Sequence, residues 1–146
     1  MKIAIGSDHR GFKLKKKLIE YLQRKRHEVI DLGTDSEDSC DYPEFALKVA
    51  RGVARKNFDR GILICNSGLG MTMAAGSVKG VRAANCIDLS MARFSREHND
   101  ANVLVMGAAY VKENLAKKMA DVWLKTEFAG GRHLRRIKMF TTYGTK

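Results

Sequence analysis

Residues 62–71 read Ile-Leu-Ile-Cys-Asn-Ser-Gly-Leu-Gly-Met, and this stretch decides the fold. Its apolar half has the length and composition of a buried strand, and its glycine-rich half predicts a turn. The residues from Met71 to Val78 then favour a helix. A strand tip that opens into a helix N-terminus presents backbone N–H groups and the positive end of a helix dipole. We therefore expect Cys65, at this tip, to be reactive if exposed, and the turn to hold an anion.

Segments of strand and helix character alternate on both sides of this stretch. Apolar runs predict strands at residues 2–6, 28–32, 61–65, 81–86 and 102–106. Amphipathic runs predict helices at residues 12–26, 43–53, 71–78, 88–97 and 115–123, and a last basic helix from about residue 132. This alternation indicates an α/β fold whose mainly parallel five-stranded sheet is covered by helices on both faces.

Length and composition indicate one soluble domain. The chain has 146 residues, of which 45% are hydrophobic and 29% charged, so we expect a single domain over residues 1–146. The N-terminal apolar run is too short for a signal peptide, and no run approaches the ~20 residues of a membrane span. Cys40, Cys65 and Cys86 form no Cys-x-x-Cys pair, which disfavours disulfides and zinc and fits a cytoplasmic protein. We expect no metal and no membrane partner.

The net charge of +11 is the unusual property of the composition. Basic residues cluster at 13–17, 24–26 and 132–138. Solvated helix faces and a preference for anionic small molecules explain these clusters most simply. A nucleic-acid-binding module is the alternative, but aromatic residues do not interleave with the basic runs to form a stacking platform. We therefore expect no nucleic-acid partner.

Two phosphate-binding signatures can be tested against the cysteine turn, and both fail. A dinucleotide fingerprint that starts at Gly68 and Gly70 would need glycine at Met73. A cysteine phosphatase loop would carry an arginine six residues after Cys65, where Met71 stands. Without that guanidinium, attack of Cys65 on a phosphate ester loses its main stabilising charge. What remains is a thiol placed to act as a base beside an anion-binding turn.

Two further groups complete the candidate site. Asp8 and His9 follow the first strand, and Cys65 ends the third, so they meet at one rim if the sheet is parallel. Arg132 and Arg136 are one helical turn apart, and two guanidiniums in that arrangement suit a dianionic phosphate. For that pair alone, two solvated arginines would be the simpler interpretation.

The chain resembles a known family, the type B ribose-5-phosphate isomerases and their hexose-phosphate isomerase relatives. The resemblance runs nearly end to end, and it rests on five segments in fixed order. These are Ser7-Asp8-His9, Asp41-Tyr42-Pro43, the cysteine loop, Arg96-Glu97-His98-Asn99-Asp100-Ala101-Asn102-Val103, and Gly130-Gly131-Arg132-His133-x-x-Arg136. Each segment is short, but their order and spacing together are highly specific.

The resemblance implies a Rossmann-like three-layer sandwich without nucleotide and with a C-terminal helix. It implies a homodimer or a dimer of dimers whose active sites are shared between subunits. The implied reaction is metal-free and cofactor-free aldose–ketose isomerisation of a sugar phosphate. The first candidate is D-ribose 5-phosphate to D-ribulose 5-phosphate through an enediolate, in the pentose phosphate pathway of the cytoplasm. The alternative substrate is a hexose 6-phosphate such as that of allose or galactose.

The resemblance also assigns roles to individual residues. Cys65 is implied to be the base that moves a proton between C2 and C1, and His98, from the partner subunit, assists opening of the furanose ring. Ser67 keeps the hydroxyl where the family usually has threonine. The turn amides that would stabilise the enediolate belong to Asn66, Ser67, Gly68, Leu69 and Gly70. The implied substrate contacts are Asp8, His9, Tyr42, Asn99, Arg132 and Arg136.

The sequence departs from the family pattern at two places near the expected site. The loop that usually reads Cys-Gly-Thr-Gly is here Cys65-Asn66-Ser67-Gly68, and the Asn66 side chain could narrow the pocket. An arginine that many members carry after the fifth strand aligns with Ala109. Loss of that charge is expected to weaken phosphate binding or to shift preference toward another sugar phosphate.

Overall fold

The computed structural model describes the backbone of residues 1–143 and the side chains of residues 1–141. The strands are β1 (Lys2–Ser7), β2 (Glu28–Asp31), β3 (Arg60–Cys65), β4 (Ala83–Asn85) and β5 (Val103–Gly107). The helices are α1 (Phe12–Arg24), α2 (Tyr42–Ala54), α3 (Leu69–Gly76), α4 (Leu89–Glu97), α5 (Glu113–Lys125) and α6 (Gly131–Tyr143). In the described part of the chain, no helix combines the length and apolar character that crossing a membrane requires.

The five strands form one sheet in the order β2-β1-β3-β5-β4, and all neighbouring strands are parallel. The predicted α/β fold is confirmed, and its sheet is parallel throughout rather than mainly so. From β1 the chain forms β2 on one side and then β3 on the other. The strand order therefore reverses between β1 and β3, and ligands of such sheets bind beyond the carboxyl ends of the strands at this point. The residues that follow β1 and β3 flank that position.

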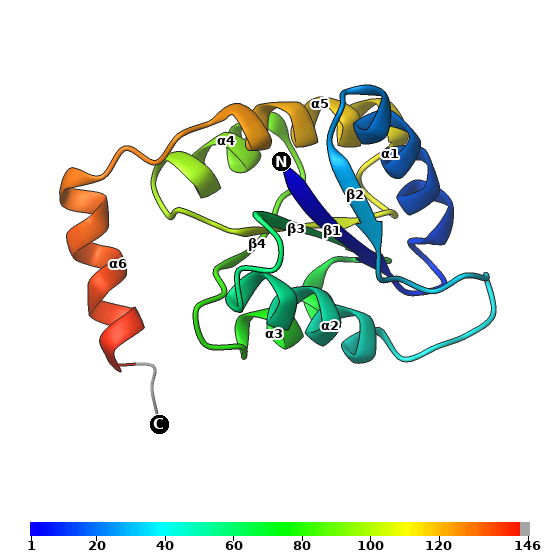
Figure 1. Ribbon diagram of the computed structural model, residues 1–146, viewed down its shortest axis with the longest axis horizontal. Helices are drawn as coiled ribbons and strands as arrows, with labels where there is room; N and C mark the ends of the chain where they lie inside the picture. Colours follow the sequence, from blue (N-terminus) through cyan, green and yellow to red (C-terminus); the bar gives the residue numbers. More distant parts are fainter. Residues whose placement is uncertain (144–146) are drawn as a thin grey trace.

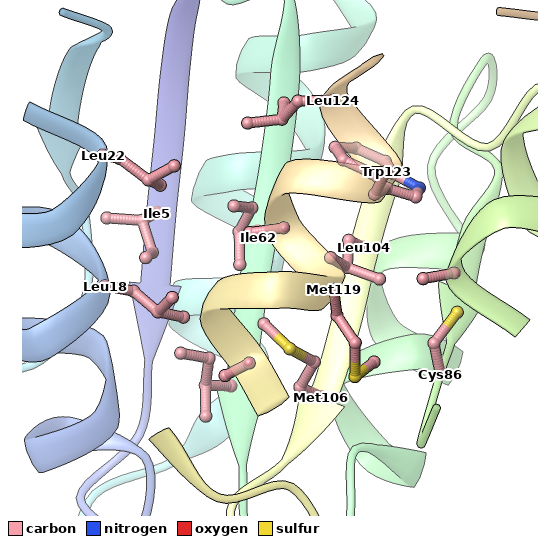
Figure 2. Close-up of a cluster of buried hydrophobic side chains, with 14 of the residues drawn as sticks. Ile5, Leu18, Leu22, Ile62, Cys86, Leu104, Met106, Met119, Trp123 and Leu124 are labelled. Carbon is pink, nitrogen blue, oxygen red and sulfur yellow. The ribbon is translucent and has the colours of Figure 1, made fainter. Parts of the chain in front are cut away.

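Helices α1, α4 and α5 cover one face of the sheet, and α2 and α3 cover the other (Figure 1). Strand residues alternate between two buried clusters because successive side chains point to opposite faces. In β3, Ile62 and Ile64 belong to the cluster under α1 and α5, which includes the fully buried Trp123 and is drawn in Figure 2. Leu63 and Cys65 belong to the cluster under α2 and α3. The sheet thus directs the Cys65 side chain toward α2 and α3.

Helix α6 stands away from this three-layer body (Figure 1). The segment before it is tied to the body by the Ala129 N–H, which donates to the Glu97 carbonyl at 2.9 Å. Leu134, Met139 and Phe140 of α6 are 42%, 60% and 53% exposed. A cavity of about 920 Å³ lies between α6 and the segment that joins α3 to β4. The helix therefore presents an apolar surface that this chain alone does not cover.

Three predicted boundaries change for local reasons. Helix α1 ends at Arg24 because Arg26 adopts a φ of +64°, which a continuing helix does not allow. Helix α3 begins at Leu69, two residues early, because Gly68 with φ +84° makes the turn and caps it. Strand β4 is half its predicted length, since the backbone N–H of Arg82 donates to the Asn102 side chain at 2.8 Å.

Lys15 corrects the interpretation of the first basic cluster as a solvated helix face. Its side chain is 1% exposed, and its Nζ donates to both carboxylate oxygens of Asp31 at 2.8 and 2.7 Å. A third bond goes to the carbonyl of Thr34 at 2.6 Å. An ammonium group is buried only with such partners. Lys15 thus joins α1 to the end of β2.

Candidate active site

The turn after β3 is built around the sulfur of Cys65. The Gly68 backbone N–H donates to Cys65 Sγ at 3.2 Å, and Cys65 is only 5% exposed. Ser67 Oγ accepts a hydrogen bond from the Leu69 N–H at 3.3 Å, at the start of α3. The first N–H groups of a helix have no partner within the helix, so this turn aims unpaired donors beside the sulfur. A reactive thiol needs access to its partner, and the single chain exposes little of Cys65. The neighbouring Asn66 is exposed.

Close backbone contacts with β5 hold the cysteine turn in place. The N–H groups of Ala108 and Ala109 donate to the carbonyls of Cys65 and Asn66 at 2.8 and 3.0 Å. A Cβ on Gly107 would lie 2.6 Å from the Ser67 carbonyl, so only glycine fits there without displacing the turn. The end of β5 therefore fixes the height of the turn above the sheet.

Asn85, at the end of β4, is a residue of this site that the sequence analysis does not single out. Its Nδ2 donates to the Ser67 carbonyl at 3.3 Å. Its Oδ1 is buried, has no partner among the described residues, and would lie 2.3 Å from a Cβ placed on Gly68. The sequence of β4 offers no signal for this contact, because the strand has three residues of ordinary composition.

Tyr42 lies beside the same turn. A Cβ on Gly70 would lie 2.6 Å from Tyr42 Cζ and 3.0 Å from Tyr42 Oη, so the phenol ring covers the first turn of α3. Tyr42 is 39% exposed at the start of α2, where Pro43 follows it. Its hydroxyl is thus held near the α3 N-terminus.

Asp8 and His9 follow β1 and have different roles. Asp8 is 6% exposed, and its Oδ1 accepts from the N–H groups of Arg10 and Gly11 at 2.9 and 3.1 Å. Its carboxylate therefore shapes the turn before α1. His9 Nδ1 accepts from the Cys40 N–H at 3.3 Å, which places the proton of the neutral ring on Nε2.

A cavity of about 250 Å³ opens between the ends of β1, β3 and β5. It is lined by His9, Arg10, Glu37, Asn66, Ala108 and Ala109. The two rim segments that the sequence predicts to meet, Asp8-His9 and Cys65-Asn66, are therefore adjacent. Among the side chains of residues 1–141, no three of metal-ligating type gather at this or any other place.

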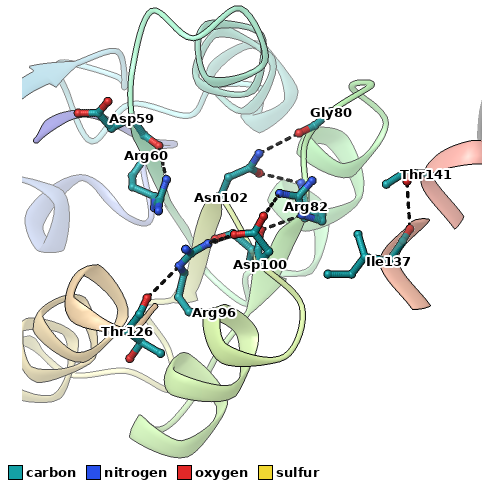
Figure 3. Close-up of polar contacts among 11 residues, drawn as sticks. Asp59, Arg60, Gly80, Arg82, Arg96, Asp100, Asn102, Thr126, Ile137 and Thr141 are labelled. Carbon is teal, nitrogen blue, oxygen red and sulfur yellow. Dashed lines mark hydrogen bonds and ion pairs between the residues drawn. The ribbon is translucent and has the colours of Figure 1, made fainter. Parts of the chain in front are cut away.

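An ionic network at the amino ends of β4 and β5, opposite the strand ends that carry Cys65, builds the turn after α4 (Figure 3). Arg96 Nη1 donates to Asp100 Oδ1 at 2.8 Å, and Arg82 Nη2 donates to Asp100 Oδ2 at 2.6 Å. The Arg96 side chain is 5% exposed, which makes it the most deeply buried member of the network. The network fixes the turn that carries residues 98–99.

His98 and Asn99 therefore lie at the other end of the sheet from Cys65. Their turn leads into Val103, the first residue of β5, whereas Cys65 pairs with Gly107 at the last. From Val103 to Gly107 the strand advances four residue steps, so its two ends are roughly 13 Å apart. A single chain does not bring His98 and Cys65 onto one small substrate.

The two arginines of α6 belong to the second group. Arg132 and Arg136 are exposed on the helix that stands off the body. Between them and α4, the ring of His133 stacks on His98 at 4.3 Å, and His98 stacks on Phe94 at 4.9 Å. Partial burial, together with the neighbouring His98 ring and the guanidiniums of Arg132 and Arg136, lowers the pKa of His133 below its usual value. His133, to which the sequence analysis assigns no role, is thus part of this group.

Fold and site together define an open parallel α/β protein with a thiol and a small polar cavity at the point where the strand order reverses. The sequence profile of the Ribose/Galactose Isomerase family matches residues 3–140. The chain is also 45% identical to ribose-5-phosphate isomerase B of Escherichia coli strain K12 over 140 residues, which are 96% of this chain and 94% of that protein. The chain belongs to the Ribose/Galactose Isomerase family.

Two solved structures have the same fold over almost the whole chain. Ribose-5-phosphate isomerase B of Clostridium thermocellum matches with a TM-score of 0.97 and 50% identity, covering 99% of this chain and 97% of that one. The enzyme of Mycoplasma genitalium, described with bound ribulose-5-phosphate, matches with a TM-score of 0.95 and 42% identity, covering 99% and 97%. The resemblance seen in the five sequence segments is confirmed.

Proposed function

We propose that this protein interconverts D-ribose 5-phosphate and D-ribulose 5-phosphate in the cytoplasm. The observation that carries the proposal is the cysteine turn beside the cavity of His9 and Asn66, at the point where the strand order reverses. The relatives named ribose-5-phosphate isomerase B, one of them with ribulose-5-phosphate bound, support this substrate.

Cys65 acts as the base in the proposed reaction. Its thiolate removes the proton from C2 of the open-chain aldose, and the electron pair forms the enediolate as the carbonyl oxygen at C1 becomes negative. The same proton returns to C1, while the hydroxyl proton of O2 passes to O1, which leaves a hydroxyl at C1 and the carbonyl at C2. The amides of the turn and the Ser67 hydroxyl are placed to stabilise the negative oxygen. The 5% exposure of Cys65 suits a base that exchanges one proton with a bound sugar.

A second copy of the chain completes the proposed site. The side of the chain formed by α4 and α6, away from Cys65, carries the predicted phosphate ligands Arg132 and Arg136 and the predicted ring-opening group His98. A two-fold axis can bring the α4–α6 side of one copy against the Cys65 turn of another. The exposed apolar side chains of α6, Leu134 and Phe140, favour such docking. We therefore propose a homodimer with two shared active sites, or a pair of such dimers.

Replacement of Cys65 by alanine tests the proposed base. We expect kcat for ribose 5-phosphate to fall by about 10²–10⁴-fold, the usual contribution of a positioned base. Cys86→Ala is the matched control, because Cys86 is buried in the other cluster, and it should keep nearly full turnover. Near-native turnover of folded Cys65→Ala would show that another group is the base.

A hexose 6-phosphate, such as that of allose or galactose, is the second candidate substrate. The two departures from the family pattern, Asn66 and Ala109, line the same cavity and change its shape and charge. Discrimination between substrates is a ratio of kcat/KM values. A higher kcat/KM for allose 6-phosphate or galactose 6-phosphate than for ribose 5-phosphate would favour this candidate.

A further inference from the structure

The cavity between β1, β3 and β5 contains one charged group that is not engaged with another side chain. Of its lining residues, only Arg10 and Glu37 carry a full charge. Glu37 already pairs with Lys13, whose Nζ lies 3.1 Å from its carboxylate. Among the described residues, no carboxylate lies within ion-pair distance of the Arg10 guanidinium. The cavity therefore has one available cation.

The backbone holds Arg10 firmly at the cavity wall. Its N–H donates to Asp8 Oδ1 at 2.9 Å, and Asp8 is itself joined to β3 by its N–H, which donates to the Ile64 carbonyl at 3.3 Å. Arg10 follows His9, which lines the same cavity and carries its ring proton on Nε2 as a donor. An exposed guanidinium on a fixed backbone is ready to bind an anion.

The surroundings of Arg10 add positive charge. Arg10 also lines a neighbouring cavity of about 620 Å³, whose walls include Lys13, Lys16, Lys17 and Lys112. Ala108 and Ala109 are small, so they leave space opposite Arg10 for a group as large as a phosphate. Guanidinium, imidazole N–H and amide donors around one small cavity match a phosphate dianion.

We propose that Arg10 binds the phosphate group of the substrate. The inference rests on the proposed function, because it places the sugar phosphate in this cavity with its reacting carbons toward Cys65. Asn66 lines the cavity and follows Cys65 directly, so a sugar phosphate whose phosphate lies in the cavity has its carbon chain beside the cysteine turn. Arg10 then supplies, from the turn after β1, a positive charge to the cavity that Ala109 lines after β5.

The variants Arg10→Ala and Arg10→Lys test the inference, with Lys16→Ala as a control of equal charge. Lys16 lines only the neighbouring cavity, so the control measures the effect of net charge alone. We expect Arg10→Ala to raise KM for ribose 5-phosphate by roughly ten- to a hundredfold, the effect of losing a charge-assisted hydrogen bond. Arg10→Lys should recover part of the loss, and Lys16→Ala should change KM by less than about twofold.

Competition by inorganic phosphate separates phosphate binding from a structural effect on the turn. The inhibition constant of phosphate should rise in Arg10→Ala in parallel with KM, and the double variant R10A/A109R should bring both back toward wild type. Equal KM and inhibition constants in wild type and Arg10→Ala would overturn the inference while leaving the isomerase activity intact. A wild-type protein without activity on ribose 5-phosphate would instead overturn the proposed function.

Discussion

Gly107 offers a direct test of how β5 positions the cysteine turn. A Cβ at this position would lie 2.6 Å from the carbonyl carbon and oxygen of Ser67 and 2.9 Å from the Asn66 carbonyl oxygen. Ordinary contact begins at 3.4 Å, so Gly107→Ala must displace the turn by about 0.8 Å. Both obstructing groups are backbone, and no rotamer change relieves them. The variant therefore moves Cys65 relative to the cavity.

The displacement has two expected consequences. Overpacking of this kind lowers the free energy of unfolding by about 1–3 kcal/mol, and a misplacement near 1 Å lowers turnover by up to about 10²-fold. Urea denaturation and the kcat of ribulose 5-phosphate formation measure the two effects. Gly76→Ala is the matched control, since none of the described residues lies within 4 Å of its added Cβ, and it should be neutral or slightly stabilising. Wild-type stability and turnover in Gly107→Ala would refute the reasoning.

Three further outcomes are expected. Asp100→Asn should lower the free energy of unfolding by about 1–3 kcal/mol, because it leaves the buried Arg96 without its carboxylate; an unchanged urea midpoint would contradict this. Because the folded pKa of His133 is lowered, the unfolded chain takes up the proton first, and stability falls as pH drops below about 6.5. His133→Phe should therefore flatten the decline of Tm between pH 7.5 and 5, and an equally steep decline would argue against it. Burial raises the pKa of Cys86 to about 11, so alkylation of the native protein at pH 8, followed by mass spectrometry, should label the half-buried Cys40 and leave Cys86 unlabelled.

The fold could be predicted because its signals are local. Apolar runs and amphipathic periods indicate strands and helices without reference to their neighbours, and alternating elements favour a parallel sheet. The placement of His9 beside Asn66 follows from the same logic, since both come after parallel strands. A helix start at Asp88 or Ser90 is likewise visible in the sequence, and in the structure the Asp88 side chain accepts from the Met91 N–H at 2.8 Å.

The rest depends on contacts between distant segments, which no local pattern reveals. Lys15 looks like its solvated neighbours in the sequence, but Asp31 and the Thr34 carbonyl bury it. Asn85 acts on the cysteine turn only because β4 ends beside it. Nothing in the composition of α6 indicates that it stands away from its own body, because an amphipathic helix packs equally well on a second copy.

The central claim is that each active site is formed by the Cys65 turn of one copy and the α4–α6 side of another. Mixing two inactive variants, Cys65→Ala and the double variant R132A/R136A, tests it most directly. Each variant damages a different half of the site, so every mixed dimer should contain one intact site. Because random pairing makes half of the dimers mixed, a co-refolded equimolar mixture should recover about a quarter of wild-type activity. Tagged subunits and mass spectrometry would show that mixed dimers form. If the mixed dimers are as inactive as either variant alone, the shared-site claim is contradicted.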